Sequence, residues 1–186
     1  MSLLQLDSRW RRFNDENRAC PCCGQTFSGI FDIVFDHPDD WPHGVLDGRP
    51  GEFGQDRLGQ DLCQFDNRFF IRCALFLPVR GTGENFGFGP WIEVSRATAE
   101  SYSDISRNHV TAFSHAEGLL ANTLPLFEDD DSAPVALVLS DPAQCPEVVL
   151  ASGSLSKAQD NGISFDQLLD IYSACGQDIR PHLVSD

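Results

Sequence analysis

The sequence predicts an α+β fold, a mainly antiparallel sheet with flanking helices in one domain that spans residues 1–186. Three observations lead to this prediction. A length of 186 residues is typical of one domain. Strand patterns come first, helix patterns follow, and strands and a last helix end the chain, an order typical of α+β proteins. Two strand patterns are separated only by Asn67 and Arg68, as in an antiparallel hairpin.

The N-terminal third predicts a helix, a turn, a strand and a loop. Residues 1–19 form an N-terminal helix, because their apolar residues recur at spacings of three and four. A cysteine turn follows at 20–24, and Ile30–Phe35 is a first short strand. Residues 36–59 are rich in Pro, His and Gly, which predicts a long irregular loop. Loops of this length are usually functional or mobile.

The middle of the chain predicts the sheet. Asp61–Asp66 and Phe69–Val79 form the hairpin, and alternate residues of the second strand give it one apolar face. Gly81–Gly89 is expected to be a glycine-rich turn that leads into a strand at Trp91–Ser95. The glycines do not precede a helix N-terminus, so a hairpin turn is favoured over a phosphate loop.

The C-terminal part predicts helices around two further strands. A helix capped by Ser95 runs to Ser106, and a second helix or turn covers 110–122. An acidic loop tip at 128–131 precedes strands at 135–139 and 147–151. Ser164 and Gln167 form a capping box for a final helix that ends before Gly176.

The charge excludes some classes of partner. The chain has 28 acidic and 13 basic side chains, a net charge of −15, and Lys157 is its one lysine. Nucleic-acid binders need clustered Lys and Arg, so nucleic acid is not an expected ligand. No apolar run reaches the length of a membrane span, and the N-terminus does not resemble a signal peptide. We therefore expect a cytoplasmic protein whose partner, if it has one, is a basic protein.

A Cys-x-x-Cys-Gly turn, Cys20 to Gly24, is the strongest chemical signal. It points two thiolates at one metal, and a structural zinc ion needs two more ligands. Cys63 is the third candidate; the fourth comes from Cys22, His37 or His43. The alternative is that Cys20 and Cys23 are free thiols and Cys63 is a small buried strand residue. A thioredoxin-like redox role fits less well, because the turn does not open a helix after a strand.

A second candidate site lies in the long loop. Asp36 and His37 stand near further carboxylates in the sequence. We predict that these two residues form a binding surface together with Trp41 and Trp91. A cluster of carboxylates and imidazoles can hold a metal or act as an acid–base pair. The alternative is a turn with solvated charges, which Asp and Pro also favour.

These segments together resemble a bacterial family, domain of unknown function 2199. The resemblance runs from Cys20 to about Ser173, and it is carried by the order and spacing of its motifs: Cys20–Gly24, Phe35–Trp41, Asp61–Cys63, Phe69–Arg72, Pro78–Thr82, Phe86–Trp91 and Gly118–Pro125. It implies one intact domain of bacterial origin and brings no established activity. Where the resemblance leads one to expect a histidine after the cysteine turn, the chain has Phe27. Ser152–Leu155 likewise replaces an expected acidic-His-Pro-Leu stretch.

Two classes of function follow from the sequence. The first is a non-catalytic binding or interaction protein, for example a small acidic inhibitor of the immunity type, with or without a structural zinc site. The second is a metal-dependent enzyme that uses the Asp36–His43 loop. We favour the first, because the sequence shows no complete catalytic set.

Overall fold

The computed structural model describes residues 3–44, 46, 49–108, 115–141 and 143–184. One sheet contains β1 (Ile33–Val34), β6 (Leu75–Pro78) and β7 (Asn85–Gly89), in the order β1-β7-β6. The other contains β2 (Gly51–Phe53), β3 (Asp56–Leu58), β4 (Leu62–Phe65), β5 (Arg68–Arg72), β8 (Trp91–Val94), β9 (His115–Leu120), β10 (Pro134–Val138) and β11 (Glu147–Val149). Its order is β11-β10-β9-β8-β5-β4-β3-β2, and every neighbouring pair in it is antiparallel.

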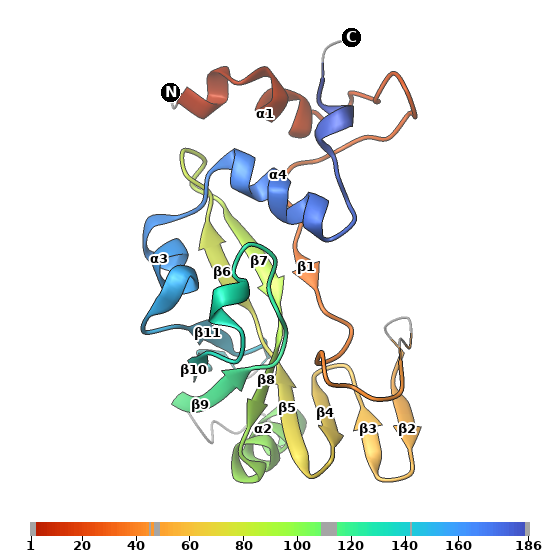
Figure 1. Ribbon diagram of the computed structural model, residues 1–186, viewed down its shortest axis with the longest axis vertical. Coiled ribbons are helices and arrows are strands. Elements are labelled where there is room, and N and C mark those ends of the chain that lie inside the picture. The colour runs from red at the N-terminus through yellow and green to blue at the C-terminus, as the bar shows by residue number, and fades with distance from the viewer. Residues whose placement is uncertain (1–2, 45, 47–48, 109–114, 142, 185–186) are drawn as a thin grey trace.

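The helices gather at the two ends and along one side of the sheets (Figure 1). They are α1 (Ser8–Phe13), α2 (Arg96–Asn108), α3 (Gly153–Asn161) and α4 (Phe165–Ala174), with short 3-10 helices at Leu3–Leu6, Glu128–Asp130 and Arg180–His182. Both described chain ends lie near α1 and α4, and α2 lies at the opposite end. The predicted α+β class with a mainly antiparallel sheet is confirmed. No helix of the described residues is long and apolar enough to cross a membrane.

The β4–β5 hairpin forms as predicted, and the strand after it differs. Asp66 and Asn67 turn the chain with φ of 50° and 59°, a conformation that these two residue types tolerate best after glycine. The expected single strand 69–79 is wrong at positions 73 and 74, where the chain passes from one sheet to the other. The backbone N–H of Cys73 donates to the carbonyl of Pro90 at this crossing. Alternate residues on both sides of it are still buried, so the predicted apolar face holds.

The predicted turn 81–89 is wrong from Asn85 onward, where β7 begins. Phe86 and Phe88 are buried in the core, and the alternating Gly87 and Gly89 lie against Asp32 and Val34 of the β1 segment. A Cβ at Gly87 would lie 2.7 Å from the Asp32 carboxylate, which accepts the Gly87 N–H at 2.9 Å. The glycines therefore allow β1 to lie close against β7, and they do not form a phosphate loop.

The predicted helix or turn over 110–122 is wrong for 115–120, which form β9; residues 109–114 lie outside the described part. The segment contains Ala, Glu and Leu, which favour helices. Pairing with β8 on one side and β10 on the other outweighs that preference. A Cβ at Gly118 would lie 2.6 Å from the carbonyl of Glu93, so the glycine permits this close pairing.

Two predicted boundaries also change. The N-terminal helix predicted over 1–19 is shorter, because α1 ends at Phe13 and Asn14 caps it. Trp10 and Phe13 are buried as the periodicity predicts, whereas Leu3 and Leu6 are exposed. The long loop predicted over 36–59 is wrong at its end, where β2 and β3 extend the sheet through pairing with β4.

The last two helices show one confirmed and one missed prediction. Both halves of the Ser164–Gln167 capping box are present at α4, and Gly176 follows it with φ of 77°. Helix α3 is absent from the sequence prediction, because its N-terminus is capped from outside. Asp130, which is only 7% exposed, accepts hydrogen bonds from the Ser154 hydroxyl and, at 2.7 Å, from the Leu155 N–H. The acidic run 128–131 is thus not only a solvated loop tip.

The core has a large and a small cluster. The large one combines buried residues of both sheets with those of α1, α2, α3 and α4. The small one is formed by Trp41, Leu58, Cys63, Phe65, Phe70 and Trp91. The Asp36–His43 loop contributes Trp41 to the small cluster, so the loop is part of the packed core.

Candidate metal centre

The cysteine turn places its three thiols at one end of the molecule, beyond α1. The Gly24 N–H donates to the Cys20 carbonyl at 2.8 Å, and the Cys20 N–H donates to the Gln25 carbonyl at 2.8 Å. Gly24 closes this turn with φ of 76°, which only glycine adopts without strain. Cys20 is buried, while Cys22 and Cys23 are exposed.

His182 reaches the same place from the other end of the chain. It ends the 3-10 helix Arg180–His182, and buried Ile179 and Leu183 anchor that helix on the core. Two arginines of the N-terminal segment hold its backbone: Arg12 donates to the Leu183 carbonyl at 3.0 Å and Arg18 donates to the His182 carbonyl at 3.1 Å. The imidazole is thereby fixed against the cysteine turn.

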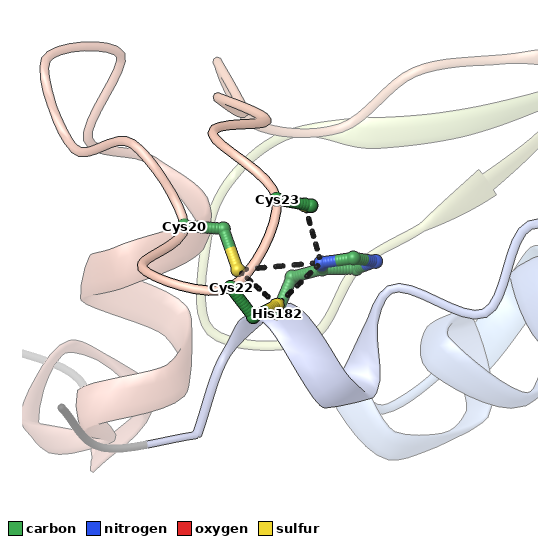
Figure 2. A group of neighbouring side chains, drawn as sticks. All are labelled: Cys20, Cys22, Cys23 and His182. Atoms are coloured by element: carbon green, nitrogen blue, oxygen red, sulfur yellow. Dashed lines mark hydrogen bonds between the residues drawn. The ribbon is translucent and has the colours of Figure 1, made fainter.

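Figure 2 shows the four side chains pointing toward one another. We call Cys20, Cys22, Cys23 and His182 the Cys3His cluster; its four ligand atoms all lie within 4.8 Å of one another. His182 Nδ1 lies 3.4 Å from Cys20 Sγ, 3.3 Å from Cys23 Sγ and 4.0 Å from Cys22 Sγ.

These separations suit one tetrahedral ion. A sulfur and a nitrogen on the same zinc lie about 3.5 Å apart when the Zn–S and Zn–N bonds are about 2.3 and 2.0 Å long. The sulfurs of Cys20 and Cys22 are closer, at 3.0 Å, than the separation of about 3.8 Å that the same bond lengths give two thiolates. Binding therefore requires the exposed Cys22 side chain to move outward, which its exposure permits.

The electrostatics favour a thiolate at the centre of the cluster. Hydrogen bonds from the Cys22 thiol and from His182 lower the pKa of Cys20 to about 6. The same contact raises the pKa of Cys22 to about 11, because its proton is shared with the Cys20 sulfur. Thiolates and neutral imidazoles are the ligands that zinc prefers in structural sites.

The structure separates Cys63 from the two cysteines with which the sequence grouped it. Cys63 lies in β4, where it is 3% exposed and packs in the small cluster with Trp41 and Trp91. Burial, followed by the charge of Asp56, raises the pKa of its thiol to about 12. Of the three fourth-ligand candidates, Cys22 joins the cluster and His37 and His43 do not. In the described residues, His182 takes the place in which Cys63 was expected.

The proposed binding residues of the long loop are not brought together in one cavity. Trp91 is fully buried, and its indole N–H donates to the Phe35 carbonyl at 2.9 Å. Trp41 is 5% exposed. A surface hollow of about 460 Å³ is lined by Asp36 and His37, but neither tryptophan reaches it. The His37 Nδ1 lies 2.8 Å from the carbonyl of Pro38, so local backbone engages the imidazole.

Asn122 fixes this loop on the sheet. It is completely buried, accepts the Trp91 N–H at 2.8 Å, and donates to the His37 carbonyl at 2.9 Å. It also donates to the Asp39 carboxylate at 2.7 Å, which in turn accepts the Thr123 N–H at 2.7 Å. Asn122 therefore engages the Asp39 side chain and the backbone of His37, whereas the buried indole N–H of Trp41 has no hydrogen-bond partner in the described part of the chain.

The remaining histidine of the loop is also paired. His43 Nε2 lies 2.7 Å from the Asp56 carboxylate, and its ring stacks on Phe53 with 4.3 Å between the ring centroids. Among the described residues, the Cys3His cluster is the one group of three or more His, Cys, Asp or Glu side chains whose ligand atoms converge in this way.

His182 is the functional residue that the sequence reasoning missed. It stands 159 positions after Cys23 and belongs to no motif. A turn with three cysteines lacks one ligand for a tetrahedron, and that deficit is a signal to search the five histidines of the chain. Phe27 stands where the family resemblance leads one to expect histidine. The centroid of its ring lies 5.7 Å from the centroid of the His182 ring.

Comparison with known proteins adds a family and no activity. The model of a family described as "Uncharacterized protein conserved in bacteria (DUF2199)" matches residues 19–163. The match includes the three cysteines of the cluster and ends before His182. No curated protein and no solved structure matches the chain.

Proposed function

The chain belongs to this family of uncharacterised bacterial proteins, and we propose that it is a non-catalytic binding protein stabilised by one structural zinc ion. The observation that carries the proposal is the convergence of the Cys3His cluster, whose four ligand atoms lie within 4.8 Å of one another. Two distant parts of the chain supply them, so the ion fastens the C-terminal segment to the N-terminal turn.

The ligand set supports zinc in a structural role. Thiolates and imidazole together suit zinc better than magnesium or calcium, which take oxygen ligands. Four protein ligands complete the tetrahedron and leave no open position for substrate, whereas catalytic zinc sites keep one position open. The function of the ion is then to hold the fold together.

Three further observations support a cytoplasmic binding protein. None of the seven cysteines forms a disulfide, as is typical of a reducing compartment. The net charge of −15 favours a basic protein partner, as expected for a small acidic inhibitor of the immunity type. In the Asp36–His43 loop, Asn122 engages Asp39, and Asp56 pairs with His43. Local backbone engages the His37 imidazole. These pairings disfavour the metal-dependent enzyme that we considered as the alternative.

Metal analysis of the native protein tests the proposal. Protein purified without chelator should contain about one zinc per chain, and a chelator should make three further thiols reactive. Cys20→Ser should remove the zinc. Cys145→Ser is the matched control: Cys145 is exposed and lies outside the cluster, so this variant should keep its zinc. A protein that is free of zinc, with the cluster thiols fully reactive before chelation, contradicts the proposal.

A further inference from the structure

One face of β9, β10 and β11 carries apolar side chains that are exposed to solvent. The register places Leu119 opposite Pro134 and places Ala136 between Glu117 and Val149, so these five residues share one face. The residues that alternate with them, among them Leu120, Val135 and Val148, are buried in the core. Leu119 and Val149 are 46% and 47% exposed, which is high for large apolar side chains in paired strands. We call these five residues the β9–β11 face.

The face is hollowed. A surface groove of about 690 Å³ runs over it, with Leu119, Ala136 and Val149 among its lining residues. A smaller hollow of about 220 Å³ shares Glu93 and Leu119 with this groove and extends it toward Asp40 and Asp131. The two hollows thus adjoin at Glu93 and Leu119, and we call them together the depression; apolar side chains, among them Leu119, Ala136 and Val149, line it.

The charge around this depression is mainly negative. Five carboxylates line the two hollows against one guanidinium, that of Arg68, among the described residues: Asp39, Asp40, Glu93, Glu117 and Asp131. Arg68 donates to Asp40 at 2.8 Å and to Glu93 at 2.6 Å, and Asp39 is engaged by Asn122. Within the described part of the chain, Glu117 and Asp131 have no cation within 4.0 Å.

We propose that the β9–β11 face docks a basic segment of a partner protein, one whose apolar side chains enter the groove while flanking Lys or Arg side chains pair with Glu117 and Asp131. This inference rests on the binding function proposed above and names its surface and the chemistry of its partner. An apolar floor with an acidic rim is the complement of such a segment.

The charge selects this occupant over two others. A second copy of the chain would bring its own Glu117 and Asp131 against the same rim, and like charges facing each other disfavour that contact. Nucleic acid carries phosphates, which the rim also repels. A basic protein segment satisfies both the floor and the rim.

NMR titration of the ¹⁵N-labelled, zinc-containing protein tests the proposal, with three synthetic peptides as probes. One is an amphipathic helix of Leu and Lys, the second carries Glu in place of Lys, and the third is a scrambled sequence with the composition of the first. The first should shift the amide signals of Leu119, Ala136 and Val149, and its affinity should fall as salt rises. The other two peptides should leave these signals in place.

Two variants separate the floor from the rim. Leu119→Ser removes an apolar contact without a change of charge and should weaken binding about tenfold. Glu117→Gln removes one rim charge and should weaken it about two- to fivefold. Leu3→Ser is the control, because Leu3 is 87% exposed and lies far along the chain from the face. Thermal denaturation and zinc content, measured on each variant, show that the fold and the metal centre are intact.

Three results would overturn the proposal: shifts that spread over the whole acidic surface and are unchanged in Leu119→Ser, equal binding of the Glu peptide, or a dimer in light scattering that Leu119→Ser dissociates. Loss of zinc does not bear on them, since the face is built without the Cys3His cluster. Failure here is therefore distinguishable from failure of the zinc proposal.

Discussion

The cysteine turn and the Asp36–His43 loop both contain dense groups of metal-binding residue types, yet the fold treats them differently. In the turn, three thiols and the distant His182 converge, and their ligand atoms contact one another rather than the rest of the protein. In the loop, Asn122 engages both Asp39 and the backbone of His37, and His43 pairs with Asp56. The candidate site is therefore identified by metal-ligand atoms that converge in space without other structural partners, and not by the number of such residues in one stretch of sequence.

If the loop is part of the fold and the cysteine turn is the site, the largest loss of stability should come from a substitution at Trp91. Trp91→Ala should destabilise the protein by about 3–5 kcal/mol, because it removes a fully buried indole from the small cluster. The zinc content should stay unchanged in the folded variant, since Trp91 lies outside the Cys3His cluster. Urea denaturation together with metal analysis measures both quantities. A variant of unchanged stability would show that Trp91 is free to serve a ligand.

Asn122 should give the next largest effect. Asn122→Ala leaves the Trp91 N–H and the Asp39 carboxylate without their buried partner, at a cost of about 2–3 kcal/mol. Thr123→Ala is the control, because Thr123 contributes only its backbone N–H to the network. Denaturant titration of both variants checks this. Equal stabilities for the two variants would mean that Asn122 does not hold the loop. The proposed difference between the loop and the cysteine turn would then be wrong.

A smaller difference in stability is expected between alanine variants of the neighbouring Asp130 and Asp129. Asp130→Ala should cost about 1–2 kcal/mol, because Asp130 caps α3 through the Leu155 N–H. Asp129→Ala should change the stability by less than about 0.5 kcal/mol, since Asp129 is exposed. Thermal melts compare the pair. Identical melting temperatures would show that the whole run 128–131 is solvated and available to a partner.

The sequence predicted those features that depend on local patterns. The α4 capping box, the β4–β5 hairpin and the alternation of buried residues around Cys73 each follow from neighbours a few positions apart. Helix α3 was missed because its cap, Asp130, lies 24 positions before Ser154. Strand β9 lies in a segment that was predicted to be a helix or turn, because its pairing with β8 and β10 outweighs its local preference.

Only the part of the candidate site that depends on a local sequence pattern could be predicted. Cys20 and Cys23 share a local motif, so the turn was recognised as a ligand-bearing element. Cys63 was assigned by residue type, but its strand register aligns it with Phe70 and so places it in the small core cluster. His182 is fixed by tertiary contacts from Arg12 and Arg18, which no spacing in the sequence encodes.

Zinc K-edge X-ray absorption of the native protein tests the central claim most directly, because it reports the atoms bound to the metal. The Cys3His cluster predicts three sulfurs at about 2.3 Å and one nitrogen at about 2.0 Å, with no oxygen from water. His182→Ala should replace the imidazole nitrogen with an exchangeable water oxygen, or it should release the ion. A native spectrum with two sulfurs and coordinated water, or one that His182→Ala leaves unchanged, would contradict the account.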